Sequence, residues 1–426
     1  MPPTVSRRGQ AVPASPIRRL MPVAEQAKKR GIHVYHLNIG QPDLETPPAM
    51  RDRLRLLEKE KVYAYTPSGG TPEFLASLQK YYAGFGIALG LDQILATTGG
   101  SEAILFAMFA CAAEGEEILV VEPFYTNYQA FAAMAGVRLV PLRTRVEDGF
   151  HLPPRGEWEK AVKPKTRAVL LCNPNNPTGT VYGRGEMEMV AGFCRDRGLF
   201  LISDEVYREF VYDGRGSSSA LELEGYEDLV VVVDSLSKRY SACGIRLGCL
   251  ATRNRDVYGA CLRMAQGRLS PPGLAQFVAA GPSDLPADYT RGVVAEYQKR
   301  RDVLYRGLKS LSGVFLAKPE GAFYFVARLP IESGDDFASW MLSDFSLGGA
   351  TVMVAPAAGF YATPGLGSDE VRIAYVLNSA DLEASVRILA AGLEKYAGAR
   401  GLRPATVPAE PVGAAAGGPD LYPTGS

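Results

Sequence analysis

The sequence predicts an α/β fold, in which helices cover a largely parallel sheet. Short apolar runs alternate along the chain with longer amphipathic segments, which is the pattern of strands followed by helices. The runs are rich in Val, Ile and Leu, as strands buried on both faces are. The length of 426 residues is roughly two to three times that of a usual domain. We therefore expect one large core and a smaller second unit.

The apolar runs that predict strands are short, and polar or Gly/Pro-rich sequence follows each of them. In chain order they span residues 93–97, 117–121, 167–172, 199–203 and 229–234. Ligands of open α/β sheets bind just beyond the carboxyl ends of the strands. The segments after the runs supply, in turn, an anion cradle, aromatics, amides, a carboxylate and an amine: 97–102, 122–125, 173–179, 204–207 and 235–238. We expect these segments to meet at one site.

The composition argues against several classes of function. Lysine plus arginine and aspartate plus glutamate both total 46, so no net field attracts nucleic acid or an anionic membrane. The sequence has no G-x-G-x-x-G and no Walker loop, so nucleotide-dependent functions lack their usual support, and we expect no metal ion. No apolar run has membrane-spanning length, and the N-terminus does not resemble a secretory signal. The six cysteines form no C-x-x-C pair, which favours reduced thiols and a cytoplasmic location.

The run from Ser235 to Gly248 resembles the S-x-S-K-x-x-x-x-x-G-x-R-x-G signature of class I/II aminotransferases. The segments 173–179 and 204–207 and the late Arg372 follow in the same family's order and spacing. The resemblance covers most of the chain and is greatest to bacterial aspartate aminotransferases. It implies a fold-type-I enzyme that depends on pyridoxal 5′-phosphate and works as a homodimer with shared active sites.

The resemblance also implies two domains. A large domain, residues 52–308, is expected to bind the cofactor and to carry a mixed, mostly parallel seven-stranded sheet between helices. Residues 15–51 and 309–397, from both ends of the chain, form a smaller α/β domain. Residues 1–14 are expected to be a flexible arm. Residues 398–426 are rich in Ala, Gly and Pro, which predicts a disordered tail.

By the same resemblance, Lys238 binds the cofactor as a Schiff base, and Asp204 faces the pyridine nitrogen. Without the motif, Lys238 would be interpreted as a solvated surface charge and Asp204 as a helix N-cap. Asn176 and Tyr207 are expected to stabilise the cofactor's phenolate. Asn-Pro-Asn-Asn-Pro is also a plain turn sequence, and Tyr207 also fits a core position. As in relatives, the bond between Asn176 and Pro177 is expected to be cis.

The cofactor's phosphate is expected where backbone N–H groups converge at a helix start, at Gly99-Gly100-Ser101. A guanidinium and two hydroxyls would complete this anion site: Arg246, Ser235 and Ser237. The resemblance adds Tyr65, which would reach the phosphate of the neighbouring subunit. Tyr125 is expected to stack on the pyridine ring, with Phe124 as the alternative.

Gly40, Asn176 and Arg372 are the residues that the resemblance places around the substrate. The missing side chain of Gly40 permits close approach. Arg372 lies in an apolar alternation, where a charge needs a partner such as the substrate's α-carboxylate. One bacterial branch binds the distal carboxylate with a lysine at the position of Ser101. Arg268 of the neighbouring subunit is the expected replacement, and a surface arginine beside a loop is the alternative.

The predicted reaction is transamination of an L-amino acid, aspartate first, with 2-oxoglutarate by a ping-pong mechanism in which Lys238 moves the proton. Aromatic and alanine-type donors stay open, because a few groups around the distal side chain decide specificity. A carbon–sulfur β-lyase would use the same lysine, aspartate and arginine. A metabolite-sensing regulator is disfavoured, because the segment before the core is too short and Pro-rich for a DNA-binding arm.

Overall fold

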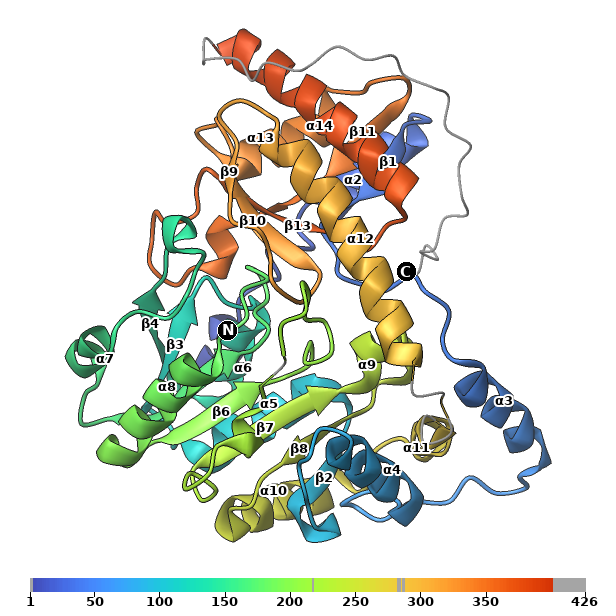
Figure 1. Cartoon of the computed structure of the whole chain (residues 1–426), viewed down its shortest axis with the longest axis vertical. Helices are drawn as coiled ribbons and strands as arrows, with labels where there is room; N and C mark the ends of the chain where they lie inside the picture. Colours follow the sequence, from blue (N-terminus) through green and yellow to red (C-terminus); the bar gives the residue numbers. More distant parts are fainter. Residues whose placement is uncertain (1–2, 217, 282–284, 286–287, 401–426) are drawn as a thin grey trace.

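A seven-stranded sheet forms the centre of the computed structural model, which describes residues 3–216, 218–281, 285 and 288–400 (Figure 1). Its strand order is β2–β8–β7–β6–β5–β3–β4, and only β8 runs antiparallel to its neighbours. The strands are β2 (Ile94–Thr97), β3 (Glu117–Glu122), β4 (Arg138–Arg143), β5 (Thr166–Cys172), β6 (Phe200–Asp204), β7 (Val230–Ser235) and β8 (Gly248–Ala251). The predicted mixed, mostly parallel sheet is confirmed.

The five predicted runs coincide with β2, β3, β5, β6 and β7, and each end agrees to within one residue. The sequence analysis missed β4 and β8. Strand β4 lies at the edge of the sheet, contains Pro141 and has exposed arginines at both ends, which an edge strand tolerates. Strand β8 is only four residues long and follows a glycine- and arginine-containing loop, so it shows no clear apolar run.

Helices cover both faces of this sheet. Alternate residues of each strand point to opposite faces, so Leu119 of β3 joins one core and Val120 the other. The first core is completed by helices α4 (Pro72–Ala83), α7 (Arg155–Ala161) and α8 (Arg184–Arg197). The second core is completed by helices α5 (Gly99–Cys111), α6 (Asn127–Ala135) and α10 (Arg255–Arg268). Burial on both faces explains why the strands are apolar throughout.

A second group of elements joins the two ends of the chain. Strand β1 (His33–His36) pairs in parallel with β11 (Ala350–Met353), and in Figure 1 the blue β1 lies beside orange and red elements. A four-stranded sheet has the order β12 (Ala355–Pro356), β13 (Glu370–Ala374), β10 (Tyr324–Arg328) and β9 (Phe315–Leu316). The helices packed here are α2 (Met21–Lys29), α12 (Tyr289–Lys309), α13 (Gly334–Ser343) and α14 (Ser379–Arg400).

The remaining helices are α1 (Arg7–Ala11), α3 (Pro48–Leu56), α9 (Leu236–Arg239) and α11 (Gly273–Ala279). The expected domain boundaries after residues 51 and 308 fall inside α3 and α12, and the division into domains stays a prediction. The expected N-terminal arm contains α1. The expected disordered tail is wrong for residues 398–400, because α14 continues through them, and residues 401–426 lie outside the described part. No helix of the described ranges combines the length and the apolar character needed to cross a membrane.

Candidate active site

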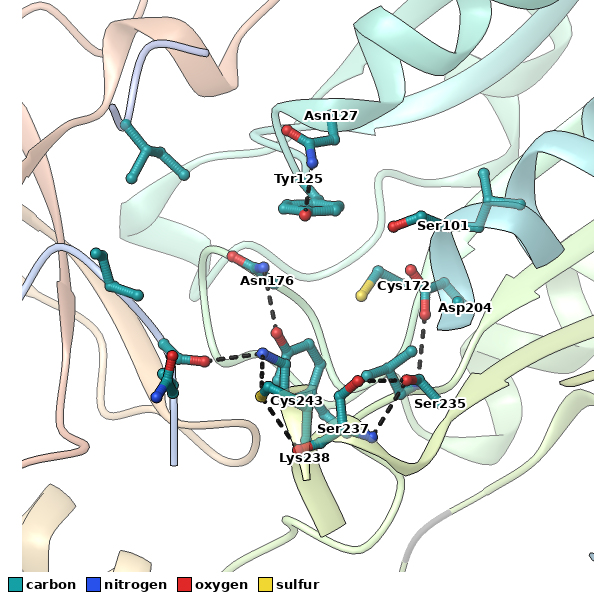
Figure 2. Close-up of a pocket in the computed structure, with 18 of the residues that line it drawn as sticks. Ser101, Tyr125, Asn127, Cys172, Asn176, Asp204, Ser235, Ser237, Lys238 and Cys243 are labelled. Atoms are coloured by element: carbon teal, nitrogen blue, oxygen red, sulfur yellow. Dashed lines mark hydrogen bonds between the residues drawn. The ribbon is translucent and has the colours of Figure 1, made fainter. Parts of the chain in front are cut away.

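A cavity of about 600 Å³ lies at the carboxyl edge of the seven-stranded sheet, between this edge and strands β10 and β13. All five predicted strand-end segments contribute to its lining, through Ser101, Tyr125, Asn176, Asp204 and Lys238. Figure 2 shows these side chains converging from separate loops and helix starts. Parallel strands place their carboxyl ends at one edge, which is why segments far apart in sequence meet here.

Lys238 lies in α9, the short helix that follows β7. Its half-buried amine donates a hydrogen bond to the Gly40 carbonyl at 2.9 Å and lies 3.8 Å from the Cys243 sulfur. Within the described part of the chain, no carboxylate forms an ion pair with it. The amine is therefore held in the cavity by neutral groups, unlike a solvated surface lysine.

Asp204 is the last residue of β6 and is only 5% exposed. It accepts hydrogen bonds from the Tyr128 hydroxyl at 2.6 Å and from the Val206 backbone at 3.3 Å. Burial raises the pKa of the Asp204 carboxyl to about 6, against the opposing effect of the two hydrogen bonds. Among the described side chains, none forms an ion pair with it. A buried acid of this kind favours a cationic ligand as its partner.

Arg372 lies on β13 and is 2% exposed. Its guanidinium donates to the Asn176 side-chain oxygen at 3.1 Å and to the Asn38 carbonyl, and it lies over the rings of Tyr324 and Phe360. Burial lowers the pKa of Arg372. Its Nε has no partner, and no described carboxylate reaches it. A buried cation with an unused donor is suited to an anionic ligand.

Asn176 connects Arg372 to the aromatic hydroxyls of the cavity. Its amide nitrogen donates to the Tyr207 hydroxyl at 3.4 Å, and the Tyr207 and Tyr324 hydroxyls lie 3.0 Å apart. Burial raises the pKa of Tyr207 well above its usual value, so the phenol stays protonated and can donate to an oxygen anion. The network therefore presents hydroxyl and amide donors next to a fixed guanidinium.

Gly40 is required by close packing. A side chain at this position would overlap the Tyr324 hydroxyl. The Gly40 carbonyl accepts from the amine of Lys238 and, at 3.4 Å, from the Tyr324 hydroxyl. The N-terminal segment thus contacts the cavity through its backbone, and the expected role of Gly40 beside the substrate stays a prediction.

Helix α5 begins at Gly99, in the segment where the sequence analysis expected an anion cradle. Gly99 has a φ of +73°, and a Cβ there would lie 2.7 Å from the guanidinium of Arg246. No side chain caps this helix start, so its first N–H groups are available to a ligand. The groups that line this part of the cavity are Gly100, Ser101, Ser235, Ser237 and Arg246.

Tyr125 lines the cavity, whereas Phe124 is buried in the core and stacks on Tyr128. The Tyr125 hydroxyl accepts from the Asn127 amide at 2.8 Å, and its ring packs edge-on against Tyr128. Burial raises the pKa of Tyr125 to about 12. Of the two aromatics considered, Tyr125 is therefore the one that can stack on a ligand in this cavity.

Gly99 begins helix α5 without being part of the cavity lining, and two further expected site residues do not line the cavity of their own chain. Tyr65 is 84% exposed on the surface. Arg268 pairs with Glu102 at 3.0 Å and donates to the Ser68 carbonyl at 2.9 Å. Both were expected to act in the neighbouring subunit, and those roles stay predictions.

One backbone expectation is wrong. The Asn176–Pro177 bond is not cis; the cis bonds of the described chain are Asn173–Pro174 and Glu122–Pro123. Sequence reasoning also missed cavity residues outside the strand-end segments, among them Asn127, Ser15, Ile17 and Arg18, and it gave Tyr324 no role of its own. Tyr128 was missed as well; it is not part of the lining, but its hydroxyl donates a hydrogen bond to the Asp204 carboxylate. Only the position of Tyr128 three residues after Tyr125 gave a signal, because that spacing places both residues on one side of a helical turn.

The fold is that of an α/β protein, and its cavity brings together a lysine amine, a buried acid and a buried guanidinium, as an enzyme site for an anionic small molecule would. A family model for "Aminotransferase class I and II" matches residues 32–389. The chain therefore belongs to the class I and II aminotransferases, which depend on pyridoxal 5′-phosphate. It is accordingly an aminotransferase, as the signature around Lys238 predicted.

Similar proteins support the assignment over nearly the whole chain. A probable aspartate/prephenate aminotransferase of Aquifex aeolicus is 29% identical and covers 89% of this chain and 96% of its own. Aromatic-amino-acid aminotransferase 2 of Thermococcus litoralis is 30% identical, with 90% and 96% coverage. Among solved structures, the maleate-bound aspartate aminotransferase of Thermus thermophilus has a TM-score of 0.82 at 25% identity and covers 92% of this chain and all of its own.

The residues of the cavity fit the family's cofactor. Asp204 offers a buried acid without a cationic partner, which suits a protonated ring nitrogen. The glycine at position 99 keeps space between the helix start and Arg246, which suits a phosphate. Lys238 contributes its amine to the same lining, which Figure 2 shows. The donor set therefore matches the charges of pyridoxal phosphate.

Cys243 is expected to report on occupancy of the cavity. It is half-buried and lines the cavity, whereas the other five cysteines are buried. Buried structural thiols are inert, so iodoacetamide should alkylate Cys243 first in the cofactor-free protein, and bound cofactor should slow this reaction at least about tenfold. Peptide mass spectrometry over time measures the effect. Rapid labelling of a different cysteine, or labelling of Cys243 at equal rates with and without cofactor, would contradict it.

Proposed function

We propose that this chain transfers the amino group of an L-amino acid, with aspartate as the first donor, to 2-oxoglutarate by a ping-pong mechanism. One observation carries the proposal. Arg372 is a buried guanidinium without a carboxylate partner in the described chain, and it lines the same cavity as the amine of Lys238. A carboxylate on Arg372 and an amino group near Lys238 are the two ends of an α-amino acid.

Pyridoxal phosphate, when bound, accepts the amino group and withdraws electrons from the α-carbon. Lys238 would hold it covalently and Asp204 would face its ring nitrogen. Asn176 and Tyr207 would donate to its phenolic oxygen, and Tyr125 would cover one ring face. The groups for its phosphate are Gly99, Gly100, Ser101, Ser235, Ser237 and Arg246.

The chain's own groups have distinct tasks in the proposed reaction. Arg372 orients the α-carboxylate, and the rings of Tyr324 and Phe360 beside it keep water from the guanidinium. The amine of Lys238 would take the proton from the α-carbon and deliver it to the cofactor's carbon, as general base and then general acid. Its neutral contacts with Gly40 and Cys243 leave the amine free to change partners.

Aspartate is the first donor because similar proteins from Aquifex aeolicus, Rhizobium meliloti and Thermus thermophilus are named for it. Aromatic donors are the second candidate. The cavity has apolar lining at Ile104 and Phe131, and the Thermococcus litoralis relative is named for aromatic amino acids. Alanine-type donors have less support from the lining, because a methyl group would leave this apolar surface uncovered.

We also propose a homodimer with shared active sites. Tyr65 is exposed beside Val62 and Tyr63, which are exposed as well. Apolar side chains that gather on one surface indicate an interface. Tyr65 and Arg268 would then complete the neighbouring cavity. The cytoplasmic location stays a prediction.

The half-reaction tests the proposed function. Protein loaded with pyridoxal phosphate is mixed with one amino acid and no oxo acid, and the oxo acid and pyridoxamine phosphate formed are measured. Equal amounts of both products per site, followed by glutamate formation when 2-oxoglutarate is added, are expected. Release of pyruvate and ammonia from cystathionine over many turnovers without any oxo acid would instead identify a β-lyase.

Replacing Arg372 by glutamine should weaken substrate use more than folding. Hydrogen bonds to charged groups contribute about 1.5–3 kcal/mol, so kcat/KM for aspartate should fall about 10- to 100-fold. The thermal midpoint should fall little, because the variant also removes a buried cation without a charged partner. Arg328→Gln, on the neighbouring strand and paired with Glu147, is the matched control. A large loss of stability with unchanged kcat/KM would make Arg372 a structural charge.

A further inference from the structure

The lining of the cavity contains one cation to which the proposed function gives no role. Four cationic side chains line it, and Asp204 is the single acid among the lining residues. Under the proposed function, Lys238 holds the cofactor, Arg246 its phosphate and Arg372 the α-carboxylate. Arg18 is the fourth cation, and neither the cofactor nor a monocarboxylic amino acid supplies an anion for it.

The backbone around Arg18 is fixed to the protein on both sides. Ile17 packs against the apolar cluster that contains Phe360, the residue whose ring lies 4.9 Å from the Arg372 guanidinium. Leu20 is buried in the core, and the Arg18 backbone bonds to Ser15 and Met21. These contacts place residue 18 at the cavity, on the side where Phe360 and Arg372 lie.

The Arg18 side chain is exposed and forms no hydrogen bond or ion pair with the described residues. Its neighbour Arg19, by contrast, is paired with Asp335. A free guanidinium with two parallel N–H donors matches a carboxylate. Arg18 can therefore bind an anion in the cavity without first giving up a protein partner.

We propose that Arg18 binds the distal carboxylate of the substrate and so makes this site selective for dicarboxylic amino acids and oxo acids. The proposal rests on the proposed function, because it assumes that Arg372 holds the α-carboxylate. Arg268 is the rival for this role. Its guanidinium already pairs with Glu102 and the Ser68 carbonyl, so binding a substrate would require those contacts to be exchanged.

Binding of unreactive acids tests the proposal directly. Maleate carries two carboxylates and butyrate one, and calorimetric titration of the cofactor-loaded protein gives a dissociation constant for each. Arg18→Gln should weaken the binding of maleate about 10- to 100-fold, because one charged contact is lost. The binding of butyrate, which has no second carboxylate, should not change. Arg18→Lys keeps the charge but loses the pair of parallel N–H donors, so its dissociation constant for maleate should lie between those of the native chain and Arg18→Gln. Arg19→Gln is the matched control and should change neither constant.

Three outcomes would overturn the proposal. Equal maleate binding by Arg18→Gln and the native chain would exclude Arg18 from the distal site. An equal decrease in the binding of maleate and of butyrate would indicate a general effect on the cavity. Loss of maleate binding in Arg268→Gln alone would assign the role to the rival. Failure of the native chain to transfer any amino group would instead contradict the proposed function, and the difference between the two acids would still test Arg18.

Discussion

Replacing Lys238 with alanine is expected to lower the rate of transamination by at least about 10⁴-fold, because the variant loses both a nucleophilic amine and a proton carrier. The fold should be unaffected, since the polar contacts of the amine with the described residues are those with the Gly40 carbonyl and the Cys243 sulfur. Single-turnover conversion of aspartate by cofactor-loaded protein measures the loss. Lys238→Arg keeps a positive charge without a transferable proton and should be as inactive as the alanine variant.

Two further measurements separate chemistry from structure. After borohydride reduction and digestion, the cofactor should remain on the peptide that contains residue 238 in the native chain and on no peptide of the variant. Added methylamine should restore part of the activity of Lys238→Ala, because a small amine fits the space that is left. Lys160→Ala, at an exposed lysine paired with Glu157, is the control. Activity within tenfold of the native rate would refute the role of Lys238.

The central sheet could be predicted because most of its strands are recognisable from their own residues. Strands β3, β5 and β7 are buried on both faces, so nearly every residue had to be apolar. Strand β4 could not be predicted, because an edge strand need not be apolar throughout and can contain a proline, here Pro141. The end of α14 was missed because a composition rich in Ala and Gly describes both a helix end and a disordered tail.

The candidate site could be predicted where its residues follow strands. Asp204 is the last residue of β6, and Lys238 lies in the short helix that follows β7. The rule for open sheets places such residues at one edge. Arg18 and Tyr324 come from segments that meet this edge only through packing of the second unit. The pKa of Asp204 likewise depends on burial by residues distant in sequence. A local sequence pattern predicts neither the packing of distant segments at the cavity nor the burial of Asp204.

Replacing Asp204 with asparagine is expected to affect activity and stability in opposite directions. The buried carboxylate lines the cavity and pairs with no cation among the described residues, so it would stabilise positive charge that develops on a group bound there. Its loss should lower kcat by about 10³-fold, as removal of a preorganised electrostatic group does. Asparagine keeps an oxygen for the Tyr128 hydroxyl, so the hydrogen bond at this position is retained. Steady-state kinetics with aspartate and 2-oxoglutarate measure the activity.

The stability effect follows from the raised pKa of Asp204. Its carboxyl has a pKa of about 6 in the folded chain against 3.8 as the reference, so the folded state binds more protons between these values. The free energy of unfolding therefore falls as the pH rises from about 4 to about 6. The total decrease is roughly 3 kcal/mol for a pKa shift of about two units, and it is complete above that range. Without cofactor, Asp204→Asn should unfold at a higher temperature than the native chain at pH 8 and at the same temperature near pH 4. A variant that is less stable at both pH values would identify Asp204 as a structural cap, because the turn bond from Val206 would then outweigh the burial of charge.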